Sequence, residues 1–82
     1  MKTYMKVSFN SEGARPSEIV SRLHMIGFRP THGNYDFTYD WDHTATVDDA
    51  LFLADKVHEA LRGMNVIFKM ETEDVAGSLD ID

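Results

Sequence analysis

The stretch Tyr35-Asp36-Phe37-Thr38-Tyr39-Asp40-Trp41-Asp42 decides the fold class, because aromatic and polar residues alternate along its whole length. Successive side chains of a β-strand point to opposite faces, so one register places four aromatic residues on one face and three carboxylates with a threonine on the other. This pattern is typical of a strand that buries its apolar face. Phe37 and Tyr39 are therefore expected to pack against helices, and Thr38 and Asp40 to face outward.

Three other segments are predicted to be strands. Residues 4–9 and 64–71 alternate apolar with polar side chains, and residues 28–32 form a shorter extended segment. Pro30 has no amide hydrogen, so the strand at 28–32 is expected at an edge of the sheet. The pair Gly33-Asn34 predicts a two-residue hairpin turn between this edge strand and the aromatic strand.

A first helix is predicted over residues 16–26, where apolar residues recur at helical spacing. Gly27 is expected to end this helix in the left-handed conformation. Phe28 is then expected to fold back onto Leu23, which is the contact that accompanies a Schellman motif.

A second helix is predicted over residues 47–61, with Thr46 as its N-cap and Asp49 as the reciprocal partner. His58 lies near the middle of the apolar stripe, which predicts a packed core histidine. Phe52 points away from the centre of that stripe. It is therefore either an ordinary exposed apolar residue or a contact to a second subunit or to the end of the chain.

The predicted order of elements is β-α-β-β-α-β, and right-handed crossovers place both helices on one side of the sheet. This is an α+β class protein with the ferredoxin-like βαββαβ two-layer sandwich plan, in which the strands have the spatial order 4-1-3-2. Residues 1–73 are expected to form a single domain. Residues 74–82 are acidic and contain glycine, which predicts a frayed tail.

The composition limits the partners of this protein. The chain has 82 residues, a net charge of -6 and no cysteine, so disulfides are excluded and a cytoplasmic location is expected. No apolar run approaches the roughly 20 residues of a membrane helix. Excess acidic charge makes nucleic acid an unfavourable partner, because such binding rests on lysine and arginine.

The predicted plan and the segment Val7-Ser8-Phe9-Asn10-Ser11-Glu12-Gly13, which runs into the helix at Pro16, resemble ACT-type regulatory domains. In that family the loop after the first strand and the start of the first helix bind small effectors, often amino acids. The resemblance implies that Asn10 and Gly13 are ligand-binding residues. Residues 61–72 are also similar to the ends of small uncharacterised archaeal proteins, a resemblance that implies no activity.

No catalytic constellation is evident in the sequence. Asp40, Asp42 and His43 come closest to a metal cluster, but the sequence places no second histidine or glutamate beside them, which favours a solvated acidic strand end. No histidine has a serine or cysteine nucleophile with a third orienting group. We therefore expect no bound metal, no cofactor and no enzymatic activity.

The remaining apolar residues predict a surface for association. Tyr4 and Ile67 on the open sheet face and Phe52 on the second helix are left over once the inward faces are assigned. The favoured prediction is a non-enzymatic interaction module that forms a homodimer through them. A small-ligand regulatory domain using the loop at 10–16 is the alternative. A nucleic-acid module on the open sheet face is a weaker one, because Tyr4 is the single aromatic residue expected there.

Overall fold

The computed structural model describes residues 1–73, which form four strands and two helices. In chain order these elements are β1 (Lys2–Ser8), α1 (Pro16–Ile26), β2 (Arg29–Pro30), β3 (Phe37–Asp40), α2 (Val47–Ala60) and β4 (Ile67–Thr72). The α+β class is therefore confirmed. The tail predicted for residues 74–82 lies outside the described residues.

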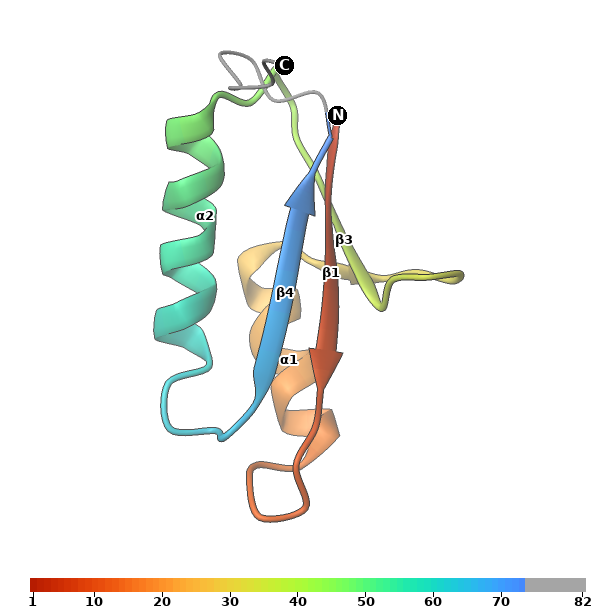
Figure 1. Ribbon diagram of the computed structural model, residues 1–82, viewed down its shortest axis with the longest axis vertical. Coiled ribbons are helices and arrows are strands. Elements are labelled where there is room, and N and C mark those ends of the chain that lie inside the picture. The colour runs from red at the N-terminus through yellow and green to blue at the C-terminus, as the bar shows by residue number, and fades with distance from the viewer. Residues whose placement is uncertain (74–82) are drawn as a thin grey trace, which may run out of the picture.

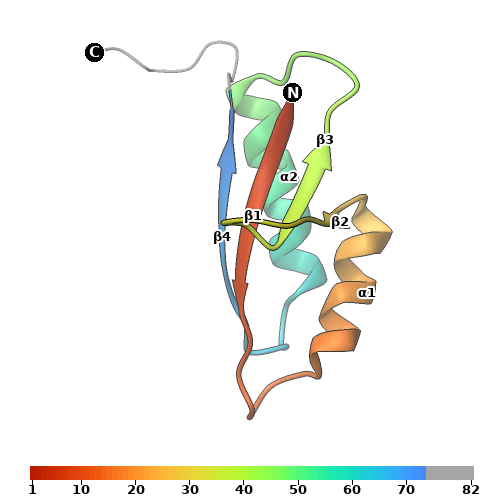
Figure 2. The same ribbon diagram turned by 90° about the vertical axis from the view of Figure 1, so that its right-hand side faces the viewer.

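The four strands form one sheet with the order β2-β3-β1-β4, in which every neighbouring pair is antiparallel. Read from the β4 edge, the same order is 4-1-3-2. Figures 1 and 2 show both helices on the same side of the sheet, which leaves its other face open. Pro30 lies in the edge strand β2. An edge strand has a neighbour on one side only, so it tolerates a residue that has no amide hydrogen to donate.

The core lies between the sheet and the two helices. Met5 of β1 and Phe37 of β3 are 0% and 5% exposed, and both belong to a single buried cluster. The other members of that cluster are Ile19, Leu23, Phe28, Leu53, Val57, Leu61 and Met64. Phe37 therefore has the inward position that the alternation predicts, and Tyr39 is half-buried against the same cluster.

Local signals end and begin the helices as predicted. Gly27 has a φ of 119°, and the Phe28 N–H donates to the Leu23 carbonyl at 3.0 Å, which makes a Schellman motif. At the start of α2, the Asp49 N–H donates to the Thr46 hydroxyl at 3.1 Å, and the Thr46 N–H donates to the Asp49 carboxylate at 3.0 Å. Neither described helix has the length and apolar character that crossing a membrane requires.

The aromatic strand is shorter than its alternation predicts. β3 begins at Phe37, and the Thr31 N–H donates to the Asp36 carbonyl at 3.0 Å across a longer loop, so the predicted two-residue turn is wrong. The Asp36 N–H in turn donates to the Met5 carbonyl at 2.9 Å, which fixes the end of this loop against β1. Tyr35 therefore precedes the strand and packs on the open sheet face, opposite to its predicted side.

Three other side chains differ from their predicted positions. Thr38 is on the outer face but is only 8% exposed, because Tyr4 and Arg29 flank it on the neighbouring strands. Phe9 lies beyond the end of β1 and is 46% exposed. His58 is exposed, since it lies one position after a buried residue of α2 and thus about 100° further around the helix.

Candidate functional site

The open sheet face carries an aromatic pair. Tyr35 stacks on Tyr4 of β1, with ring centroids 5.0 Å apart and an interplanar angle of 28°. The Lys6 ammonium lies 5.8 Å from the Tyr35 ring centroid. The Tyr35 hydroxyl donates to the Glu71 carboxylate on β4, a hydrogen bond that raises the pKa of Tyr35. The Tyr35 side chain therefore lies across β1 between the side chains of Tyr4 and Lys6, and its hydroxyl is bound to β4.

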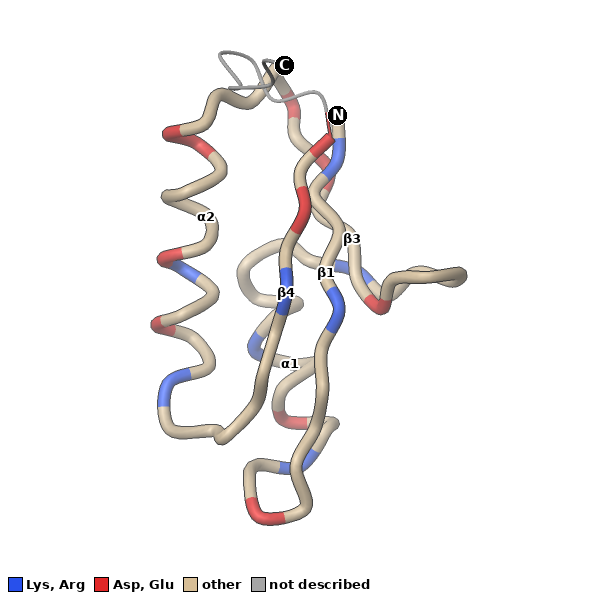
Figure 3. Tube along the Cα trace, viewed as in Figure 1, with Lys and Arg blue, Asp and Glu red and all other residues tan. Residues whose placement is uncertain are grey.

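Basic side chains gather on this face although the protein as a whole is acidic. Lys6 of β1 and Lys69 of β4 are directly opposite each other, and Figure 3 shows the blue segments of these strands side by side. Within residues 1–73 neither lysine forms an ion pair. Lys2 and Arg29 both pair with Asp40, and the Arg29 guanidinium is the main cause of the lowered pKa of that carboxyl.

A buried hydroxyl lies on the same face. The Oγ1 atom of Thr38 has no hydrogen-bond partner among residues 1–73, although more than nine-tenths of this residue is buried. Thr38 is directly opposite Tyr4 in the register of β1 and β3. Buried polar atoms are nearly always hydrogen-bonded, so this covered and unpartnered hydroxyl is an exception to the usual pattern.

A second charged cluster surrounds His43 at the start of α2. Its Nδ1 is 2.6 Å from Asp42 and its Nε2 is 3.2 Å from Asp49, and these carboxylates raise the pKa of His43. Both ring nitrogens thus face carboxylate acceptors. Only the protonated imidazole can donate from both nitrogens, so this arrangement favours the charged form of His43. Asp40, the third member of the predicted cluster, pairs with basic side chains instead. The described part of the chain holds no group of three acidic or histidine residues with metal-binding geometry.

The loop after β1 is closed by its own hydrogen bonds. The Asn10 side chain accepts the Glu12 N–H at 2.7 Å, and the Asn10 carbonyl accepts the Gly13 N–H at 2.9 Å. A Cβ atom at Gly13 would lie 2.3 Å from the Met64 carbonyl oxygen, so only glycine fits this close approach. Asn10 and Gly13 therefore have structural roles here, and ligand binding by them stays a prediction.

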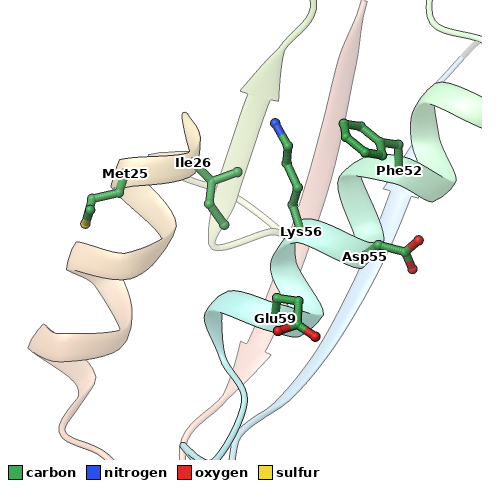
Figure 4. A pocket seen from close by; sticks show the side chains of 6 residues that line it. All are labelled: Met25, Ile26, Phe52, Asp55, Lys56 and Glu59. Atoms are coloured by element: carbon green, nitrogen blue, oxygen red, sulfur yellow. The ribbon is translucent and has the colours of Figure 1, made fainter.

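A groove of about 480 Å³ opens between the C-terminal end of α1 and the middle of α2. We call it the helix groove and define it by its lining residues Met25, Ile26, Phe52, Asp55, Lys56 and Glu59. Figure 4 shows Ile26 and Lys56 between the two helices, with Phe52 about one turn closer to the N-terminal end of α2 than Lys56. Met25 is 83% exposed and Phe52 is 62% exposed, so the groove presents apolar surface to water.

The three side chains predicted for association lie on two surfaces. Phe52 lines the helix groove, whereas Tyr4 and Ile67 belong to the open sheet face, where Ile67 is 76% exposed. Sequence reasoning missed Met25 and Tyr35. The position of Met25 off the apolar stripe of the first helix is a signal that would have found it. No local signal distinguishes Tyr35 from the aromatic residues that follow it.

Comparison with protein-family models, with curated proteins and with solved structures found no match for this chain. The resemblances to ACT-type domains and to small archaeal proteins therefore stay predictions.

Proposed function

We propose that this chain is a small non-enzymatic interaction module with a ferredoxin-like βαββαβ plan, and that it forms a homodimer through the helix groove. The exposure of Met25 and Phe52 in one groove is the observation that carries the proposal. Each Å² of apolar surface removed from water contributes about 25 cal/mol. A domain of this size buries roughly 60% of its unfolded surface, a smaller fraction than larger domains bury, so a second copy adds burial that the fold lacks.

The rim of the groove carries both signs of charge, with the Lys56 ammonium alongside the carboxylates of Asp55 and Glu59. A two-fold interface brings the same patch of both copies together, so a residue away from the axis meets a different residue of the other copy, and a residue near the axis meets its own counterpart. Lys56 lies next to Asp55 in the sequence, and both line the groove. The Lys56 ammonium lies 5.1 Å from the centroid of the Phe52 ring. A two-fold contact with Lys56 against the partner subunit's Asp55, and the reverse, would surround the apolar side chains with pairs of opposite charge.

The open sheet face suits a second copy less well. A two-fold contact centred on this face would bring Lys6 and Lys69 close to the same two lysines of the partner. Four ammonium groups in a contact that excludes water repel one another strongly. Tyr4 is also already stacked on Tyr35, which leaves less of its ring for a partner. These features favour the helix groove over the surface that Tyr4 and Ile67 define.

Sedimentation velocity across the micromolar range tests the proposal. The unaltered chain is expected to change from monomer to dimer with concentration, and Phe52→Asp is expected to stay monomeric. Ile67→Asp is the matched control, because it places the same charge at an apolar residue of the other face that is also mostly exposed. Lys56→Asp should weaken the dimer, and adding Asp55→Lys to it should restore the dimer. A monomer at every concentration, or a dimer that tolerates Phe52→Asp, contradicts the proposal.

A further inference from the structure

Side chains on the outer face of β1 form a short stacked row. Tyr4 and Lys6 project from the same face about 7 Å apart, as residues two positions apart on a strand do. Tyr35 lies between them, stacked on Tyr4 on one side and close to the Lys6 ammonium on the other. The hydrogen bond to Glu71 holds the Tyr35 ring in this position. The Tyr35 ring is therefore held on the sheet by contacts with three residues of its own chain.

The lysines beside this row are arranged for an anion. Lys6 and Lys69 face each other across adjacent strands, where like charges destabilise the pairing. Carboxylates of residues 1–73 form no ion pair with either lysine. A phosphate placed between the two ammonium groups would replace this repulsion with two favourable contacts.

A buried hydroxyl lies in the same part of the sheet. Thr38 is beside Tyr4 on the neighbouring strand, and its Oγ1 has no partner among residues 1–73. Because Tyr4 and Arg29 flank it on both sides, this hydroxyl can meet a base only where these side chains move aside. The aromatic rings and the pair of lysines are therefore the groups that this face presents to a ligand.

We propose that the open sheet face binds single-stranded nucleic acid, with a base stacked on the Tyr4–Tyr35 pair and the adjoining phosphates held by Lys6 and Lys69. Aromatic side chains on an open four-stranded sheet bind unpaired bases, since every base has a π-face. The bases of a duplex are covered by their own neighbours and cannot reach a flat sheet. Single strands are therefore preferred over duplexes.

The acidic character of the whole protein sets the conditions under which this binding is seen. The net charge of -6 opposes a polyanion at long range, so the overall affinity is expected to be weak. Salt screens this repulsion. The lysine–phosphate contacts instead release counterions from the strand, so their contribution rises as salt is lowered. Each phosphate neutralised on a single strand contributes about 0.7 to the slope of log affinity against log salt. Contacts from two lysines therefore predict a slope of about -1.4.

Fluorescence anisotropy with labelled oligouridylate and oligothymidylate of about 10 nucleotides tests the proposal, with a duplex of the same length as the comparison. Tyr4→Leu should weaken single-strand binding by about 5- to 150-fold, which is the range for losing one stacked base. Lys6→Gln should reduce the magnitude of the salt slope by about 0.7. Lys56→Gln, a lysine of the helix groove, is the matched control and should leave the slope unchanged. Circular dichroism and urea unfolding show whether each variant is folded.

Three results would overturn the inference: absence of single-strand binding at low salt, equal binding of the duplex, or equal binding of inorganic polyphosphate, which has phosphates but no bases. Binding of oligouridylate without oligothymidylate identifies RNA as the ligand. Binding of oligothymidylate without oligouridylate identifies DNA. The monomeric variant Phe52→Asp should bind as well as the unaltered chain, because the helix groove is a separate surface. Nucleic-acid binding and dimer formation can therefore fail independently.

Discussion

Replacing Phe37 by alanine should cost about 3–5 kcal/mol of unfolding free energy, because this ring is 5% exposed at the centre of the buried cluster. A chain of 82 residues is expected to have a total stability of about 4–12 kcal/mol. The substitution therefore removes a large share of that stability. Phe37→Leu keeps most of the apolar volume and should cost about 1 kcal/mol, so it reports on the same site in a protein that remains folded.

Urea unfolding followed by tryptophan fluorescence measures both variants. Trp41 is the only tryptophan, and in the folded protein its indole N–H donates to the Thr3 hydroxyl at 2.8 Å, so its surroundings change on unfolding. At a denaturant dependence of about 1 kcal/mol per molar urea, Phe37→Leu shifts the midpoint by about 1 M. All variants are compared at one protein concentration, because dimer formation makes the apparent stability depend on concentration.

Ile67→Ala is the control for these measurements. Ile67 is 76% exposed on the opposite face of the sheet, so its truncation should change stability by less than about 0.5 kcal/mol. A loss below about 1 kcal/mol for Phe37→Ala, or equal losses at the two positions, would refute the assignment of the inner and outer sheet faces.

Three further outcomes follow from local geometry. Gly27→Ala should lower stability by about 1–2 kcal/mol in the same urea assay, because φ is 119° and the added Cβ would lie 2.9 Å from Tyr39 Cε2. Thr46→Ala should cost about 1 kcal/mol through loss of the α2 cap. NMR titration should give His43 a pKa above 6.5, and Asp42→Asn should lower it. Because the folded pKa is raised, the stabilisation from this ion pair is fully present below about pH 6.5 and is lost as pH rises through the folded pKa; an unshifted His43 would contradict the pairing.

The ends of the helices were predictable because their signals are local. Gly27 is the residue that tolerates the left-handed conformation, and Thr46 and Asp49 satisfy each other's backbone amides within four residues. The inward direction of Phe37 was equally predictable, because side chains alternate along a strand whichever strands pair with it. The helix ends and the inward face of β3 were therefore identified correctly, whereas the Gly33-Asn34 turn was not.

The position of Tyr35 was not predictable from its surroundings in sequence. Its side of the sheet depends on the bond from the Asp36 N–H to Met5, a residue of the first strand. The same limit applies to the candidate sites. The exposure of Phe52 follows from the period of α2, but the helix groove exists because Met25 of another helix lies beside it. Alternation along one strand says nothing about such distant partners.

The first strand of the chain lies in the middle of the sheet, and this placement determines how the protein can fold during synthesis. Thr3 on β1 shares a hydrogen bond with Thr72 on β4, 69 residues later. At about 5–20 residues per second, translation takes about 3–14 s to supply that partner. Throughout this interval one edge of β1 is unpaired and open to strands of other nascent chains. Lys2 and Lys6 on β1 disfavour such edge-to-edge pairing, so these charges protect the chain before its sheet is complete.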